Sequence, residues 1–457
     1  MRHHSIVGRL GSADTTAITP TRADTHVTEI TFIDEFGRVG YGLGQALDQL
    51  RDVGMRPSEA AVDLALLAAA ITAADTRISR DADAQDSWTR EIDLFLPVHD
   101  AALWGGLAPL IVTTLNFLTG DRWGVHFRPR ISTIPSLVSA PTKLRTATPS
   151  SVCLFSGGLD SFIGAIDLLS AGESPLLVSH YWDGITSKHQ TYCGEALKRR
   201  FPGATIHHIR ARVGFPNDVV DTFSVENTLR GRSFLFFALA AMAADAIGGQ
   251  TVVHVPENGL ISLNVPLDPL RLGALSTRTT HPFYMARFEE LLRGLGLSVT
   301  LHNPYVFQTK GQMAKGCADV GFLQHEARNT MSCSSPAKAR WALTEADRQP
   351  KHCGHCVPCL IRRAAIKEGW GTDDTEYQIP NLHERVLDTK RAEGEHVRSF
   401  QLALSRLSKK PARAAFDIHR PGPLTDHPGK LADYEAVYVA GLREVGRLLE
   451  GVQAKPS

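Results

Sequence analysis

The chain has 457 residues, about three times the ~150 residues typical of one domain, so two or three structural units are expected. Its 49 Lys and Arg balance 48 Asp and Glu, which excludes a surface built to wrap duplex nucleic acid. The most apolar run, 234–244, is too short for the ~18–20 residues that cross a bilayer, and no secretory signal is recognisable. We therefore expect a cytoplasmic protein without a membrane-spanning segment.

Residues 1–145 are predicted to form an accessory α+β domain. Alternation of apolar and polar residues predicts strands at 28–42, 90–97 and 123–129. Ser58 is a plausible N-cap for a long apolar helix that ends near Arg77. The stretch 139–151 is rich in Ser, Thr and Pro and lacks periodicity, so we interpret it as a linker.

Residues 146–375 are predicted to form an α/β domain with a parallel sheet. From Val152 onward the pattern runs strand, glycine turn, helix, strand, helix, which is typical of a parallel sheet covered by helices. The last unit, 376–457, is predicted to be a helical extension, because the apolar residues of 431–452 recur at helical spacing.

A glycine-rich loop directly follows the first strand of the second unit. Its residues are Ser156, Gly157, Gly158, Leu159, Asp160 and Ser161. Two glycines permit a tight turn and close approach of a ligand, and the helix that follows offers unpaired N–H groups to a phosphate. No Gly-Lys-Ser/Thr sequence completes a Walker A loop. The alternative, an ordinary strand-to-helix turn, is disfavoured by the length of the pattern.

A cysteine cluster predicts one structural zinc site. Its three closely spaced thiols are Cys353, Cys356 and Cys359. Tetrahedral zinc needs four ligands, and Cys333 is the natural fourth, with His352 and His355 as competitors. Free thiols are disfavoured, because clustered thiolates repel one another without a cation. The remaining cysteines, 153, 193 and 317, are expected in the core.

The loop resembles the PP-loop of the ATP pyrophosphatases, which have an adenine nucleotide alpha hydrolase-like fold and cleave ATP between the α and β phosphates. The later motifs T-x-S-C and C-G-x-C-x-x-C-L-x-R-R-A resemble one branch of that family, the QueC-type 7-cyano-7-deazaguanine synthases. These motifs comprise Thr330, Ser332, Cys333, Cys353, Gly354, Cys356, Cys359, Leu360, Arg362, Arg363 and Ala364. Arg232, and Lys310 with Pro304, match further elements, and the resemblance covers about 150–370.

The chain departs from that branch in its acceptor region. Ser233 follows Arg232 where the branch has Asn, and the long polar loop 256–282 replaces a Tyr-Pro-Asp-Cys-Arg loop. With its N-terminal extension the chain resembles most the QatC-type, QueC-like components of the Qat anti-phage defence systems.

The resemblance implies adenylation of a 7-deazaguanine carboxylate, with ATP, Mg²⁺ and Zn²⁺ as cofactors, and formation of an amide or nitrile. The acceptor would be ammonia or an amine of a partner protein from a defence operon. The loop would hold the pyrophosphate, with Asp160 supporting the loop or the Mg²⁺ from a solvent-facing position. Lys310 and Arg232 would stabilise developing negative charge. The loop residues Glu257, Asp268 and Arg271 are expected to bind the acceptor substrate, with the acids accepting a guanine-like N–H edge.

Two alternatives remain at this stage. A tRNA-modifying PP-loop enzyme, such as a thiolase, would need a reactive cysteine near the loop and a basic face, which the neutral charge and the apolar context of Cys153 disfavour. A nucleotide-sensing scaffold subunit without turnover would fit a decayed loop, whereas this loop is intact. We expect no membrane contact and no general nucleic-acid binding.

Overall fold

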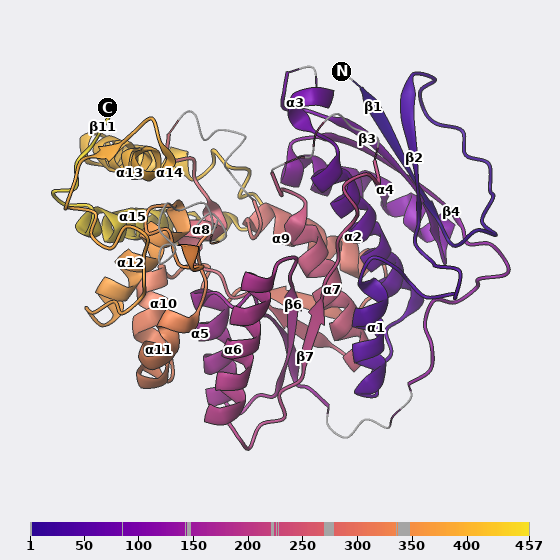
Figure 1. Cartoon of the computed structure of the whole chain (residues 1–457), viewed down its shortest axis with the longest axis horizontal. Helices are drawn as coiled ribbons and strands as arrows, with labels where there is room; N and C mark the ends of the chain where they lie inside the picture. The colour runs from indigo at the N-terminus through magenta and orange to yellow at the C-terminus, as the bar shows by residue number, and fades with distance from the viewer. Residues whose placement is uncertain are drawn as a thin grey trace.

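Two parallel β-sheets and a helical C-terminal unit make up the computed structural model, which describes residues 2–84, 86–141, 143, 148–220, 224, 226, 228–268, 278–334, 336 and 348–456. Figure 1 shows the N-terminal unit and the C-terminal helices on opposite sides of the central sheet. One hydrophobic cluster runs through both sheet units, and a second holds the C-terminal helices together. The two sheets therefore share a core.

The N-terminal sheet contains four strands in the order β2-β1-β3-β4. They are β1 (His3–Arg9), β2 (Thr25–Thr31), β3 (Glu91–Val98) and β4 (Arg122–Pro129). All three pairings are parallel, with helices packed against the strands, so the unit is α/β and the expected α+β class is wrong. The alternation of apolar and polar residues within a strand indicates which face is buried. Whether the neighbouring strand runs parallel or antiparallel depends instead on the segments that connect the two strands.

The helices of this unit are α1 (Leu43–Asp52), α2 (Glu59–Arg77), α3 (Arg80–Asp83) and α4 (Ala101–Thr119). As predicted, the Ser58 side chain caps α2 by accepting from the amide of Ala61. Sixteen consecutive residues of α2, from 61 to 76, are buried. A helix apolar on all sides must be covered on all sides, and α2 lies between the N-terminal strands and α7 (Arg232–Ile247).

The central sheet has five parallel strands in the order β7-β6-β5-β8-β9. These are β5 (Ser151–Leu154), β6 (Pro175–His180), β7 (His208–Ala211), β8 (Thr251–His254) and β9 (Val299–His302). The connecting helices include α5 (Leu159–Ser170), α6 (Gly184–Arg200), α7, α8 (Gly259–Leu263) and α9 (Pro282–Gly294). The strand order reverses direction between β5 and β8, where sheets of this kind bind ligands at the carboxyl ends of the strands.

The rest of the chain is mainly helical. Its longer helices are α10 (Lys310–Gly316), α11 (Val320–Glu326), α12 (Val357–Gly369), α13 (Ala392–Lys409), α14 (Ala414–Asp417) and α15 (Leu431–Leu448). A short parallel pair, β10 (Leu387–Asp388) with β11 (Ala454–Lys455), ties the last residues to this unit. As predicted, α15 buries one apolar face, which includes Tyr434, Tyr438 and Leu442.

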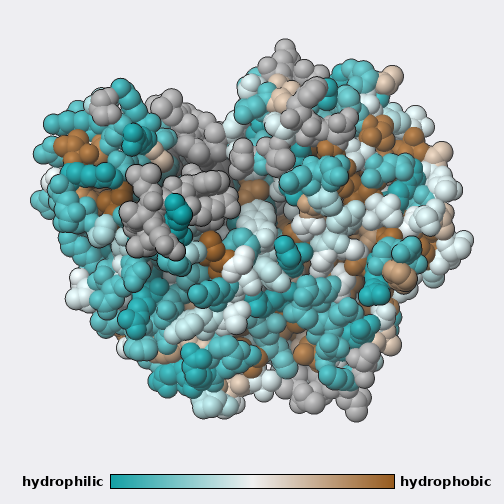
Figure 2. Space-filling model, in the orientation of Figure 1, coloured by the Kyte–Doolittle hydropathy of each residue, from teal (hydrophilic) through white to brown (hydrophobic). Residues whose placement is uncertain are grey.

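One helix of the described chain, α4, is long and apolar enough to cross a membrane by length and composition, which the sequence analysis did not anticipate. Within the fold it packs against β4 and α9, so it serves as a covering helix of the N-terminal sheet. Run 234–244 is the core of α7, as expected. In Figure 2 the visible face is largely hydrophilic, with hydrophobic side chains interspersed.

Candidate functional site

The loop 156–161 crosses from the end of β5 to the start of α5, as predicted. Gly157 has φ +77°, and a Cβ there would lie 3.0 Å from the backbone nitrogen of Gln190, so conformation and space both require glycine. The two serine hydroxyls of the loop lie 3.1 Å apart, and that of Ser156 accepts from the amide of Gly158. The loop thus holds its own shape, and the first turn of α5 presents N–H groups to an anion.

Most side chains of this loop are more enclosed than the sequence analysis expected. Asp160 and Ser161 are only 6% and 5% exposed, so their expected solvent-facing position is wrong, and Leu159 is fully buried. Lys310 Nζ lies 3.0 Å from one carboxylate oxygen of Asp160, and the Asn258 side-chain amide donates to the other at 2.8 Å. The residues after β8 and at the start of α10 cover the loop, which its own six residues could not reveal.

Asp160, which is buried, and Glu257, which is partly buried, form a carboxyl pair with divergent pKa values. Burial raises the pKa of Glu257 well above its usual value, and the negative charge of Asp160 raises it further. Burial acts in the same direction on Asp160, but Lys310 and hydrogen bonds from Glu257 and Asn258 hold the pKa of Asp160 below its usual value. The two opposite shifts favour the state in which Glu257 holds the proton and Asp160 is ionised.

A cavity of about 180 Å³ opens at the carboxyl ends of β5, β6 and β8. A cavity of ~150 Å³ admits a benzene ring, so this space suits one planar heterocycle. Its apolar walls are Leu154, Val178, Phe236, Phe237, Leu239 and Val255. Ser156 and Ser161 of the phosphate loop also line it, as does Glu257. A ring bound here would lie directly beside a bound phosphate.

Arg232, the first residue of α7, supplies a partly buried cation to this cavity. Its guanidinium lies between the rings of Trp182 and Phe236, at 4.5 and 4.9 Å from their centroids. Its Nε has no hydrogen-bond partner among the described residues. Burial lowers the pKa of Arg232 to about 10, so the group remains charged at neutral pH. A partly buried cation that has no ion pair among the described residues attracts an anionic ligand.

His180, which the sequence analysis did not single out, adds a hydrogen-bond acceptor. Its Nε2 lies 2.9 Å from the carbonyl oxygen of Val213, and a carbonyl only accepts, so Nε2 carries the proton. Burial lowers the pKa of His180 to about 4 and keeps the ring neutral. Nδ1 is then a buried acceptor without a partner in the described chain, and the hydroxyl of Thr280 is likewise unpartnered. The sequence signal that could have identified His180 is its position as a polar residue at the end of an apolar strand.

Of the three residues predicted to bind the acceptor substrate, the structure places one at the cavity. Glu257 lines the cavity. Asp268 is buried but is not among the cavity-lining residues, and its neighbours Val265 and Leu267 pack into the C-terminal hydrophobic cluster. Arg271 lies outside the described residues. A substrate role for Asp268 and Arg271 therefore stays a prediction.

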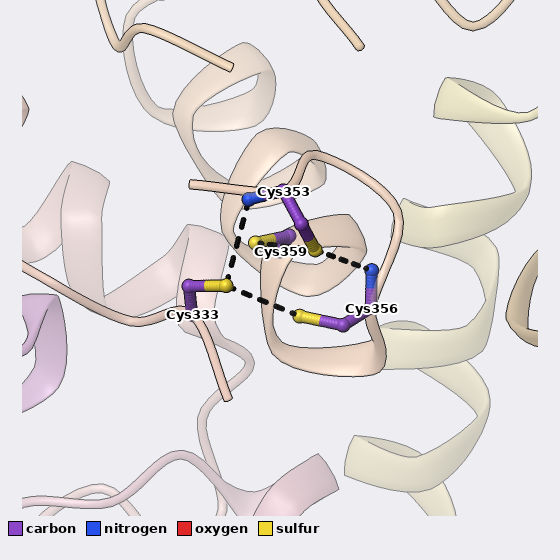
Figure 3. Close-up of side chains that lie close together, drawn as sticks. All are labelled: Cys333, Cys353, Cys356 and Cys359. Atoms are coloured by element: carbon purple, nitrogen blue, oxygen red, sulfur yellow. Dashed lines mark hydrogen bonds between the residues drawn. The ribbon is translucent and has the colours of Figure 1, made fainter. Parts of the chain in front are cut away.

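The four predicted cysteines converge on one point (Figure 3). Their sulfurs all lie within 4.8 Å of one another, with 4.0 Å between Cys333 and Cys356 and 3.8 Å between Cys353 and Cys359. Four thiolates at 2.3 Å from a tetrahedral zinc would be ~3.8 Å apart, so the donor set fits Zn²⁺. The competitor His352 instead accepts from the amide of Ser332.

The cysteine cluster is joined to the phosphate loop. The segment that carries Cys333 also donates from the Met331 amide to the Gly157 carbonyl, at 2.8 Å. Arg362, on the helix that follows the last cysteines, is fully buried and donates to the Thr330 hydroxyl at 2.7 Å. A structural metal here would therefore hold the back of the phosphate loop in place.

The other three cysteines, 153, 193 and 317, are buried as expected. Burial raises the pKa of each thiol to about 12, so none forms a thiolate at neutral pH. A thiolase mechanism would need a reactive thiol near the loop, and Cys153 does not supply one.

These features define a parallel-sheet α/β domain with a PP-loop-like phosphate site and a four-cysteine centre. No family model matches the chain. The chain is similar to several 7-cyano-7-deazaguanine synthases. It is 28% identical to that of Rickettsia felis over 168 residues, covering 35% of this chain and 60% of the synthase. It is 25% identical to that of Novosphingobium aromaticivorans over 252 residues, covering 50% and 94%. The similarity supports a QueC-like family.

Proposed function

We propose that the protein uses ATP to adenylate the carboxylate of a 7-deazaguanine-type heterocycle. The observation that carries this proposal is the cavity, which joins the phosphate loop to a space for one planar ring and to Arg232, a cation without an ion pair among the described residues. The acceptor His180 and the hydroxyl of Thr280 suit the N–H and carbonyl edge of such a ring. The relatives are named as synthases of a 7-deazaguanine, which is the chemistry we extend to this chain.

A carboxylate is a poor acyl donor, because its leaving group would be oxide. In the proposed reaction a carboxylate oxygen attacks the α phosphorus of ATP, the bond to pyrophosphate breaks, and an acyl-adenylate forms. An amine nitrogen then attacks the acyl carbon, AMP leaves, and the amine proton goes to solvent. The product is an amide. With ammonia as the amine, a second ATP could adenylate the amide oxygen, and loss of AMP and a proton would then give a nitrile.

The loop 156–161 would bind the leaving pyrophosphate through its amides. Arg232 would orient the substrate carboxylate, and Lys310 would stabilise charge while its pairing with Asp160 fixes its position. We expect Mg²⁺ to enter with ATP, held through the phosphate oxygens, because both oxygens of Asp160 are already paired and the raised pKa of Glu257 favours its protonated form. Zn²⁺ at the cysteine cluster would be structural.

We further propose that the acceptor is an amine of a partner protein, and that the chain is a component of an anti-phage defence system. The proposal is supported by the sequence departures from the synthases at Ser233 and in the loop 256–282, where an altered acceptor would be accommodated. The residues 1–145, which precede the phosphate loop, would serve such a partner.

ATP–pyrophosphate exchange tests the activation step. We expect exchange in the presence of 7-carboxy-7-deazaguanine and none with benzoate, a planar carboxylate without the ring's hydrogen-bonding edge. Exchange that requires tRNA would indicate a nucleic-acid-modifying enzyme, and a folded, ATP-binding protein without exchange would indicate a sensing subunit. Either result would overturn the proposal.

Mass spectrometry of proteins co-expressed from the same operon tests the acceptor. We expect a covalent adduct of deazaguanine mass on one partner, absent with an Arg232→Met variant. Activation followed only by formation of free amide or nitrile would show that ammonia is the acceptor.

A further inference from the structure

Each of the two site cations begins a helix and is flanked by a glycine. Arg232 starts α7 and follows Gly231, while Lys310 starts α10 and precedes Gly311. A small rotation of the first turn of either helix would move the cation. The first residue of a helix is followed by helical residues on its C-terminal side but is not preceded by any. The contacts that hold these helix starts therefore decide where the cations lie.

The N-terminal unit holds the start of α7 through Asp75. This residue, on the last turn of α2, is 1% exposed, and its carboxylate accepts from the amide of Gly231 at 2.8 Å. The helix start has no side-chain cap of its own. The preceding Arg230 stacks on Trp88 of the same unit, 4.1 Å from the ring centroid. The N-terminal unit thus holds both Arg230 and Gly231 on one side of the helix start. Arg232 faces the cavity on the other side.

Asp75 is itself fixed by a rigid partner. Its second oxygen accepts from Arg90 at 2.9 Å, and Arg90 also binds both oxygens of Asp121. These three side chains are at most 2% exposed. A carboxylate in such a network cannot relax toward another position without breaking charge-assisted hydrogen bonds.

The C-terminal unit holds the residues around Lys310 in an analogous way. Glu444, on α15, accepts from the hydroxyl of Thr309 and from the amide of Gly311 at 3.3 Å. It is 7% exposed, and a Cβ on Gly311 would lie 2.8 Å from its carboxylate. A carboxylate from outside the central sheet therefore contacts both neighbours of this cation.

We propose that Asp75 and Glu444 are positioning residues, through which the N-terminal and C-terminal units set the places of Arg232 and Lys310. The assignment of the two cations to the site rests on the proposed function. The hydrogen bonds of Asp75 and Glu444 do not depend on the proposed function, so they can be tested by hydrogen–deuterium exchange without a substrate. The accessory units then act on the reaction without touching the reactants.

Hydrogen–deuterium exchange of the full-length protein without ligand tests the contacts. Asp75→Asn should speed exchange at least about tenfold in the peptide spanning 229–234, leaving 308–313 unchanged, because one charge-assisted bond is weakened. Glu444→Gln should produce the opposite pattern. Controls with the same chemical change are Asp63→Asn, on the same α2 and equally buried, and Glu368→Gln, which pairs with Arg447 near α10.

Steady-state exchange kinetics test the consequence. Asp75→Asn should raise KM for 7-carboxy-7-deazaguanine about tenfold at unchanged KM for ATP, and Glu444→Gln should raise KM for ATP. Both controls should leave both constants within about twofold. If the protein activates a different acid, the split between ATP and acid remains measurable with that acid, so failure of the proposed substrate is distinguishable from failure of this proposal.

Gly231→Ala and Gly311→Ala perturb the same contacts without removing a charge. A Cβ at 231 would lie 3.3 Å from the Asp75 carboxylate, so that carboxylate must shift slightly. Each should reproduce, more weakly, the pattern of its partner variant, which keeps the test decisive if Asp75→Asn does not fold. Variants that lower thermal stability while exchange rises uniformly and both KM values stay unchanged would show a purely structural role and overturn the proposal.

Discussion

Arg90 is a fully buried arginine and Arg232 a partly buried one, and their surroundings differ completely. Arg90 lies in the N-terminal unit, where each of its guanidinium nitrogens donates to a carboxylate or a backbone carbonyl. Arg232 lies in the central unit between two aromatic rings, and its Nε has no partner in the described chain. Burying a charge without a partner costs several kcal/mol, so such a group is retained where a ligand completes it.

A similar contrast holds for the side chains around these two arginines. Near Arg232, at the carboxyl ends of the central strands, His180 and Thr280 also carry polar atoms without a partner among the described residues. Below α2, by contrast, Asp75 and Asp121 neutralise Arg90 within the fold. The charges around Arg90 are thus neutralised within the fold, whereas the polar groups around Arg232 are left for a ligand to pair.

The largest expected effect concerns the cysteine cluster, whose four thiolates would be neutralised by a bound metal ion. We expect about one zinc per purified chain, and Cys356→Ser should lose the metal and several kcal/mol of unfolding free energy, because one of four ligands is removed. Metal analysis and chemical denaturation measure both. Cys193→Ala, a buried thiol outside the cluster, should retain the zinc. A folded Cys356→Ser protein with unchanged zinc would contradict the site.

Arg90→Met should lower the free energy of unfolding by about 3–5 kcal/mol, because it leaves the carboxylates of Asp75 and Asp121 buried without their main cation. Urea denaturation measures the change. Arg122→Met, at a site 75% exposed, is the control and should change stability by no more than about 0.5 kcal/mol. Equal effects of the two substitutions would remove the scaffold half of the comparison.

Arg232→Met makes the same chemical change in the binding site, with the opposite consequence. We expect stability within about 1 kcal/mol of the wild type, since Arg232 has no ion pair with a described residue. Acid-dependent pyrophosphate exchange should be lost, while ATP binding is retained. A loss of stability as large as that of Arg90→Met would show that Arg232 has a structural partner after all.

Glu257 gives a pH-dependent test. Its pKa is raised above the usual 4.5 in the folded protein, so the native state binds the extra proton between the two values. Stability should therefore fall as pH rises through this window, by at most about 1.4 kcal/mol per pH unit. Glu257→Gln should flatten this dependence in melting curves recorded from pH 5 to 8. A steeper fall in the variant would contradict the assignment.

The smallest effect separates two buried threonine hydroxyls. Thr280→Val removes one without a partner, so stability should change by less than about 0.5 kcal/mol while KM for the acid rises several-fold. Thr114→Val removes one that donates to the carbonyl of Leu110 at 2.7 Å, and should cost about 1 kcal/mol with unchanged kinetics. A stability loss in Thr280→Val together with a raised KM in Thr114→Val would contradict the assignment of Thr280 to the binding site and of Thr114 to the scaffold.

Local patterns of the sequence were sufficient for much of this fold. The strand–loop–helix order around 152–200 and the convergence of Cys333 on the later cysteines are confirmed, because both depend on spacing along a short stretch of chain. β1 was missed, since two histidines open it and every residue from 3 to 8 is buried, which removes the alternation. The parallel direction of the N-terminal strands was missed because it depends on distant segments.

The candidate site divides in the same way. The phosphate loop and Arg232 could be found from motifs, whereas the pairing of Asp160 with Lys310 joins residues 150 positions apart. The unpartnered state of His180 depends on groups from several elements, including the carbonyl of Val213. Such properties belong to the assembled site, so a pattern along the chain does not contain them.

The burial of α2 on all sides has a consequence for biosynthesis. Asp75 and its partner Gly231 are separated by 156 residues, so α7 leaves the ribosome long after α2. At ~5–20 residues per second the delay is roughly 8–30 s, during which the outer face of α2 has no cover. A nascent chain with an exposed apolar helix for that time is a substrate for chaperones. The element that joins the two sheets in the finished protein is thus the one most prone to aggregation while the protein is being made.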